Sequence, residues 1–228
     1  MTDYQTIQLL ETCKDAYRFF ISNLISRKRD NKVFHFLKET YLIQTAKSLV
    51  EIAWKELGGD LSRLSLSKET VKIPIKKEYL KKIKSPEVKK FIEEHINDFY
   101  YPLRTDVHVH IDGKFKIAIE CKAYTENAML KRILVDFTLF KQVYPDLAFV
   151  LLQLESQLGG DYSTSNHVKY GSPSTHTLLS YFDIDLNIIT LLEGERKVDK
   201  PIHKPKYYKA LREESLLTAL EVFEKLLQ

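Results

Sequence analysis

Residues 103–124 read LRTDVHVHIDGKFKIAIECKAY, and this stretch decides how the surrounding chain is organised. Apolar and polar side chains alternate on both sides of the step Asp112-Gly113. An Asp-Gly step between two alternating runs is a strong signal for a β-hairpin. Side chains along a strand point alternately to opposite faces, so Asp106 starts the first strand, and Glu120 and Lys122 share a face of the second. The sequence therefore predicts two carboxylates and a lysine close together on a sheet.

The segments around the hairpin predict a mixed sheet flanked by helices. Residues 126–144 have apolar side chains at helical spacing, and residues 147–154 are almost wholly apolar, as in a central strand covered on both faces. Upstream, residues 34–57 form an amphipathic pattern that predicts a helix, and residues 85–99 predict another. Residues 70–75 alternate briefly between apolar and other side chains, which predicts a strand, and Pro74 limits it to an edge or a short strand. We expect an α/β fold with a central mixed β-sheet.

Length and composition limit the classes of protein. The 228 residues are enough for one sizeable core, and we expect a single domain over residues 1–228. No apolar run approaches the roughly 20 residues that span a bilayer, and the start of the chain lacks the pattern of a secretory signal. We therefore expect a cytoplasmic protein with no membrane partner. Two cysteines are too few for a disulfide framework or a cysteine zinc site.

Positive charge is clustered rather than dominant. The formal net charge is only +4, which is compatible with a polyanionic partner without requiring one. Lysines gather between residues 76 and 90, and basic residues gather again between 196 and 209. For each group, a solvated surface and a phosphate-contacting surface are about equally favoured.

The last third of the chain contains two unusual segments. Residues 157–175 are rich in Gly, Ser, Thr and Asn and lack apolar periodicity, which indicates a long loop of the kind that is usually functional or disordered. Residues 194–209 are basic and contain Pro201 and Pro205, so we expect them to be extended and mostly exposed. A final amphipathic helix completes the segment 194–228.

Asp106, Glu120 and Lys122 of the hairpin are suited to metal-dependent phosphoryl chemistry. Carboxylates are hard oxygen ligands of the kind that Mg²⁺ prefers, and a bound Mg²⁺ activates water and offsets negative charge on phosphate. The ammonium group of Lys122 could orient that water, favour hydroxide or stabilise the transition state, and the sequence leaves these roles open.

These residues resemble the PD-(D/E)xK nuclease superfamily, with Asp106 at the start of one strand and Glu120-Cys121-Lys122 at the end of the next. The resemblance implies that Asp106, Glu120 and the backbone carbonyl of Cys121 bind Mg²⁺, with Mn²⁺ as a substitute, and that Lys122 assists the attacking water. It covers a catalytic core of about residues 34–154. One departure is that Thr105, rather than proline, precedes Asp106.

Within the superfamily the chain looks like a type II restriction endonuclease. That resemblance implies sequence-specific hydrolysis of double-stranded DNA that leaves 5′-phosphate ends. Two other functions stay open: a repair or recombination nuclease that recognises DNA structure, and a DNA-binding module without catalysis.

Glu39 is a further candidate catalytic residue. At about 100° per residue it points the same way as Ala46 and Ala53, toward the interior of the fold. A buried carboxylate needs a partner. Glu39 could form a salt bridge in the core or reach the active-site face, and some members of the resembled superfamily add an acidic residue from this helix.

His108, His110 and Cys121 lie beside the predicted acids. His-x-His on a strand could ligate zinc, but no third ligand stands at suitable spacing, so we expect the two histidines to flank bound DNA. Cys121 points to the face opposite Glu120 and Lys122, which predicts a buried thiol rather than a nucleophile.

Recognition of a DNA sequence requires side chains at base edges. The loop at residues 157–175 is the candidate reader, although a merely mobile surface loop is equally compatible with its composition. A palindromic target would favour a twofold homodimer. The candidate DNA-contacting side chains in the loop are Ser163, Thr164, Asn166, His167 and Lys169.

Overall fold

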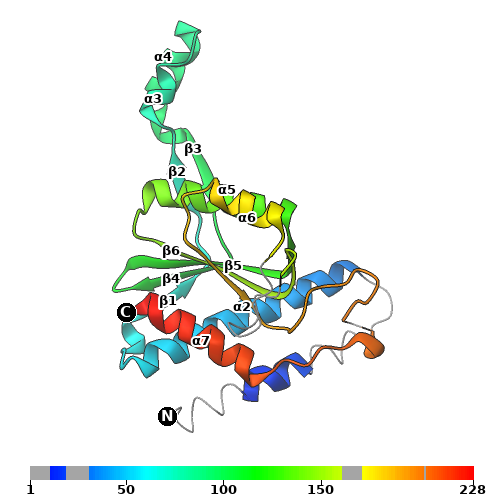
Figure 1. The fold of residues 1–228 in the computed structure, drawn as a ribbon. Helices are drawn as coiled ribbons and strands as arrows, with labels where there is room; N and C mark the ends of the chain where they lie inside the picture. The colour runs from blue at the N-terminus through cyan, green and yellow to red at the C-terminus, as the bar shows by residue number, and fades with distance from the viewer. Residues whose placement is uncertain (1–10, 19–30, 161–170, 203) are drawn as a thin grey trace.

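A five-stranded mixed β-sheet lies between two layers of helices (Figure 1). The computed structural model describes residues 11–18, 31–160, 171–202 and 204–228, without the side chains of residues 31–39 and 205. Helices α2 (Asn31–Glu56) and α7 (Glu213–Leu227) cover one face of the sheet, and α5 (Asn127–Val143) and α6 (Pro173–Ser180) cover the other. This arrangement confirms the predicted α/β class.

The sheet combines an antiparallel half with a parallel half. Its spatial order is β1-β4-β5-β6-β7, with antiparallel pairing from β1 to β5 and parallel pairing from β5 to β7. Helix α5 is the crossover that parallel strands β5 and β6 require. The predicted hairpin therefore occupies the middle of the sheet. The strand bounds are β1 Leu64–Ser67, β4 Val107–Ile111, β5 Lys114–Glu126, β6 Ala148–Gln157 and β7 Leu186–Thr190.

The turn of the hairpin has the backbone that its sequence predicts. Asp112 and Gly113 have φ values of 52° and 74°, the left-handed conformation that both central residues of a type I′ turn adopt. The Asp112 carboxylate also forms an ion pair with Arg63, which ends the short 3₁₀-helix η1 (Leu61–Arg63). A register shift between Val109 and His110 marks a β-bulge in β4.

Each face of the sheet has its own core. Ile117, Ile119 and Cys121 point toward α2 and α7, whereas Ala118 points toward α5. All four side chains are fully buried. Burial of a large apolar side chain stabilises the fold by roughly 1.5–3 kcal/mol. The alternation in β5 therefore determines which side chains of the strand face each helix layer, because a shift by one residue would expose the apolar ones. Glu120 and Lys122 continue the Ala118 face and lie on the α5 side of the sheet.

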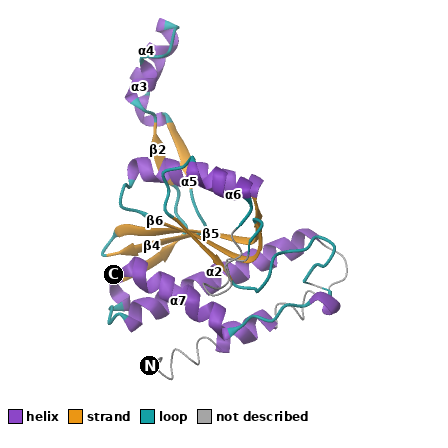
Figure 2. Ribbon diagram, viewed as in Figure 1, coloured by secondary structure: helices purple, strands orange, loops and turns teal. Residues whose placement is uncertain are grey.

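A separate projection interrupts the chain between β1 and β4. Strands β2 (Val71–Pro74) and β3 (Tyr100–Leu103) form an antiparallel two-stranded ribbon. The segment between them contains α3 (Lys77–Leu80), α4 (Pro86–Glu94) and the 3₁₀-helix η2 (Ile96–Asp98). We call residues 71–103 the arm. Figures 1 and 2 show the arm extending outward past α5, away from the sheet.

The structure refines several predicted boundaries. The predicted helices at 34–57 and 126–144 correspond to α2 and α5, and the predicted strand at 147–154 is β6. Strand β6 continues through Gln157 and α6 begins at Pro173, so the ends of the predicted loop 157–175 are regular structure. The expectation that residues 194–209 are mostly exposed is wrong in part, because Ile202 is only 1% exposed. This segment contains the 3₁₀-helix η3 (Pro205–Tyr207) and leads to α7.

Candidate active site

Asp106 is held beside Glu120 by backbone hydrogen bonds between the two hairpin strands. The Asp106 amide donates to the Ile119 carbonyl at 3.1 Å, and the Cys121 amide donates to Asp106 Oδ2 at 3.0 Å. The Asp106 carboxylate therefore accepts a hydrogen bond from the strand residue that follows Glu120. The bonds between adjacent strands, rather than side-chain contacts alone, bring the two predicted acids together.

Lys122 contacts the three oxygen atoms that the sequence resemblance implies are metal ligands. Its Nζ lies 2.5 Å from Glu120 Oε1, 3.3 Å from the Cys121 carbonyl oxygen and 3.9 Å from Asp106 Oδ2. One positive nitrogen thus lies within 4 Å of two carboxylates and a carbonyl. Lys122 thus occupies the position beside these oxygens for which a metal cation would compete.

The three side chains are mostly buried but still accessible from solvent. The exposed fractions of the Asp106, Glu120 and Lys122 side chains are 16%, 20% and 26%. Burial raises the pKa of Glu120, Lys122 opposes that increase, and the nearby charge of Asp106 adds to it. Two carboxylates that are largely shielded from water repel each other when both are ionised. A cation between them therefore lowers their electrostatic energy.

Two charged residues of the site were not singled out in the sequence. Lys68, which directly follows β1, places its Nζ 2.7 Å from Asp106 Oδ1. Asp136 of α5 lies close enough to Glu120 to raise its pKa, and burial raises the pKa of Asp136 itself. Both residues come from elements that reach the hairpin only in the folded chain. The polar connector around Lys68 and the helical stripe around Asp136 gave no local signal of this proximity.

The two histidines that are predicted to flank bound DNA, His108 and His110, lie in different surroundings in the structure. His108 is 1% exposed and packs against Phe115 with 4.6 Å between ring centroids. Its Nε2 accepts a hydrogen bond from the Thr105 amide at 3.2 Å. His110 is only partly buried and stacks on the same Phe115 ring. The burial of His108 argues against a direct DNA contact, whereas His110 keeps an accessible edge.

The remaining predicted residues fall into two groups. Cys121 is fully buried on the α2 side, which agrees with the expected buried thiol, and burial raises its pKa well above the ordinary value. Glu39 lies in α2, but its side chain is outside the described part of the structure. The loop candidates also lie outside the described residues: Ser163, Thr164, Asn166, His167 and Lys169.

The donor set fits a hard divalent cation. Among the described residues, no group of three or more His, Cys, Asp or Glu side chains is placed to hold a metal ion. Two carboxylates with one carbonyl would leave several positions for water and phosphate oxygens, which is how proteins usually hold Mg²⁺. The thiol of Cys121 and the ring of His108 point elsewhere, so the ligands that the described residues offer at this site are oxygen atoms.

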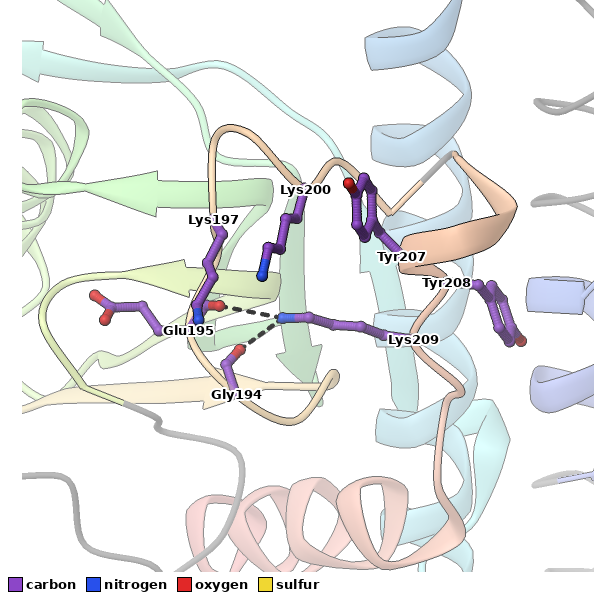
Figure 3. A pocket seen from close by; sticks show the side chains of 7 residues that line it. All are labelled: Gly194, Glu195, Lys197, Lys200, Tyr207, Tyr208 and Lys209. Carbon is purple, nitrogen blue, oxygen red and sulfur yellow. Dashed lines mark hydrogen bonds between the residues drawn. The ribbon is translucent and has the colours of Figure 1, made fainter.

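A basic pocket lies apart from these residues. It encloses about 420 Å³ and is lined by Lys197, Lys200 and Lys209 together with Tyr207 and the loop at Gly194 (Figure 3). Lys209 donates to the Gly194 carbonyl at 2.8 Å and forms a 2.9 Å ion pair with the buried Glu155. Asp106, Glu120 and Lys122 do not line this pocket.

Comparison with known proteins identifies the family. The chain is 53% identical to the type II restriction enzyme DdeI of Desulfomicrobium norvegicum over 174 residues, which are 75% of this chain and 72% of that protein. No protein-family model matches the sequence. Among solved structures, the native BbvCI A2B2 tetramer aligns with 97% of this chain and 88% of its own chain, with a TM-score of 0.38 and 14% identity.

On the basis of the sequence identity, this chain belongs to the type II restriction enzymes, which are site-specific deoxyribonucleases. In the described part of the chain, every helix is too short or too polar to span a bilayer.

Proposed function

We propose that the chain hydrolyses phosphodiester bonds at a specific sequence of double-stranded DNA and leaves 5′-phosphate ends, by the chemistry of the PD-(D/E)xK superfamily. The observation that supports this site is the convergence of Asp106, Glu120 and the Cys121 carbonyl on a single ammonium nitrogen. These three groups would hold a divalent cation, Mg²⁺ with Mn²⁺ as a substitute. When bound, that cation would supply Lewis-acid activation of water and phosphate.

The protein residues would have distinct tasks in this proposal. The hydrogen bond from the Cys121 amide fixes one oxygen of Asp106, which leaves the orientation of that carboxylate well defined. Lys122 Nζ would leave the three oxygens and turn toward the scissile phosphate, where its charge orients the attacking water or offsets the developing negative charge. Lys68 would hold the other oxygen of Asp106.

DNA recognition and assembly are further parts of the proposal. Ser163, Thr164, Asn166, His167 and Lys169 remain the proposed base-reading residues, and Glu39 remains a proposed third acid. A palindromic site would be cut by a homodimer, with one strand cleaved by each subunit. We propose that cleavage takes place in the cytoplasm, which contains the DNA in cells that have no nucleus.

Digestion of phage and plasmid DNA tests the function. We expect discrete fragments with Mg²⁺ or Mn²⁺ and intact DNA when a chelator removes the cation. Sequencing the fragment ends would give the recognition site and show whether the 5′ ends carry phosphate. Smeared products, or cleavage restricted to branched and mismatched substrates, would contradict sequence-specific cleavage.

A further inference from the structure

The positive charge of the chain is concentrated in two stretches. Residues 76–84 contain five lysines and one glutamate, a net charge of +4 that equals the formal net charge of the whole chain. Residues 194–209 have the same excess, with six Lys or Arg residues against two acids. In that second stretch Lys209 pairs with Glu155, and Arg196 stacks over Tyr124 at 3.7 Å, so part of the charge is used within the fold.

Four of the five lysines of the first stretch lie on the outer part of the arm and are exposed to solvent, and we call these four residues the arm tip. Lys77, Lys81, Lys82 and Lys84 are all exposed, and none of them has an ion-pair partner among the described residues. On the neighbouring helix α4, by contrast, Lys89 and Lys90 each lie 3.8 Å from a glutamate one turn later. The arm tip therefore carries like charges that repel one another until an anion approaches.

The base of the arm is attached to the candidate active site. Lys68 precedes β2 and Asp106 follows β3, and the 2.7 Å ion pair between them closes the base of the ribbon. Ile73 and Leu103 are buried in the core on the α5 side, and Lys76 donates to Gln142 of α5 at 2.6 Å. The arm thus starts on the same side of the sheet as Glu120 and Lys122, and its base is held in place.

We infer that the arm tip is a phosphate-contacting surface that binds the backbone of double-stranded DNA outside the candidate active site. The inference rests on the proposed DNA substrate. Lysines that meet phosphates release condensed counterions, which supplies sequence-independent affinity and makes binding depend on salt. A surface of this kind fixes the position of the duplex and leaves base recognition to other residues.

A contact with a second copy of the chain is the competing use of the arm. Tyr79, Val88 and Phe91 are 50–55% exposed, and exposed apolar side chains often mark protein interfaces. A twofold contact places the same patch of both subunits face to face. Residues 76–94, which contain that patch, have seven lysines and four glutamates, so the contact would bring together two surfaces of net charge +3. Charge repulsion therefore favours DNA as the occupant.

Binding measurements with a fourfold variant test this inference. The variant combines Lys77→Ala, Lys81→Ala, Lys82→Ala and Lys84→Ala, and a double variant, Lys55→Ala with Lys225→Ala, removes exposed lysines from the helices on the opposite face. Affinity for a short duplex is measured over a series of salt concentrations in chelator, so that cleavage plays no part. The sedimentation coefficient and thermal midpoint of each protein are measured in parallel.

We expect the fourfold variant to bind at least about tenfold more weakly, with a slope of log affinity against log salt that is smaller by about 3 to 4. The double variant should keep the wild-type affinity and slope. An unchanged slope in a folded fourfold variant would overturn the inference. A changed sedimentation coefficient, which reports a changed oligomeric state, would also overturn it if the DNA affinity were unchanged. Because binding is read without catalysis, a failure of cleavage by the wild type would count against the proposed function alone.

Discussion

Lys68 and Asp106, 38 positions apart in the chain, form an ion pair of 2.7 Å between Nζ and Oδ1. The pair joins the end of β1 to the start of β4 and closes the base of the arm. It also leaves Asp106 with a defined partner for each oxygen, because Oδ2 accepts from the Cys121 amide. One exposed lysine thus connects the geometry of the candidate metal site to the placement of the arm.

Glu120→Gln and Lys122→Ala should each lower the cleavage rate by about 100-fold or more, because each removes a group that the proposed function places on the phosphate or on the cation. DNA binding in chelator should persist, since neither change removes a phosphate contact of the arm. Asp136→Asn is a matched control that alters a neighbouring acid outside the ligand set, and we expect a much smaller loss. Single-turnover cleavage and filter binding give the two readouts, and full cleavage by Glu120→Gln would refute the site.

Lys68→Ala should lower the cleavage rate by about 10 to 100-fold, because Lys68 would orient the carboxylate that is proposed to bind the metal, and loss of such a residue usually has an effect of this size. The free energy of unfolding should change by less than about 1 kcal/mol, because the Lys68 side chain is 45% exposed and such ion pairs contribute little to stability. Lys68→Arg should restore most of the rate. Mg²⁺ titrations of cleavage would show the loss as weaker metal dependence, and equal rates for the wild type and Lys68→Ala would rule out this positioning role.

His108 should make the fold less stable as the pH falls from about 6.5 toward 4. Burial lowers the pKa of His108 to about 4 from an ordinary 6.5, His110 and Lys68 add to that change, and Glu69 opposes it. Because the folded-state pKa is the lower one, the unfolded chain takes up the proton first, and stability is lost across this window. The loss attributable to His108 reaches about 3 kcal/mol.

Urea unfolding in chelator at pH 7.5 and pH 5 measures this dependence. His108→Gln keeps an acceptor for the Thr105 amide without a titrating ring, so its stability should depend less on pH than that of the wild type. His95→Gln changes an exposed histidine of the arm and serves as the control. The same pH dependence in all three proteins would contradict the role of His108.

Lys209→Met should destabilise the fold by about 3 kcal/mol, because it leaves the buried Glu155 carboxylate without its cation. Adding Glu155→Gln should recover most of that loss, since the unpaired charge is then absent. Lys197→Met, at an exposed position of the same pocket, should change stability by no more than about 0.5 kcal/mol. Denaturant unfolding of the wild type, the two single variants and the double variant gives the coupling free energy between Glu155 and Lys209. Additive effects of the two substitutions would show that these residues act independently.

Strand β1 and the C-terminal end of β5 are features that the local sequence pattern is not sufficient to predict. Residues 64–67 alternate Leu and Ser over only four positions, within a stretch that looks like a polar connector, and they become a strand because β4 pairs with them. β5 continues to Glu126 because its parallel pairing with β6 extends to Gln157. Both outcomes depend on hydrogen bonds to distant residues, which no short window of sequence contains.

The arm illustrates the same limit at a larger scale. The strand at 70–75 and the helix at 85–99 were predictable from their residues, and both are present as β2 and α4. Their position was not predictable, because neither segment contains a local signal that β2 pairs with β3 rather than with the main sheet.

The hairpin at residues 103–124 was determined by sequence alone, since its alternation and its Asp-Gly turn are local properties that specify strand, turn and face. The approach of Asp106 to Glu120 followed from that local geometry. The proximity of Lys68 and Asp136 to the two acids, and the start of the arm beside Asp106, are seen only in the folded chain. These relationships join residues from separate elements, and they arise when the sheet and the α5 layer pack together.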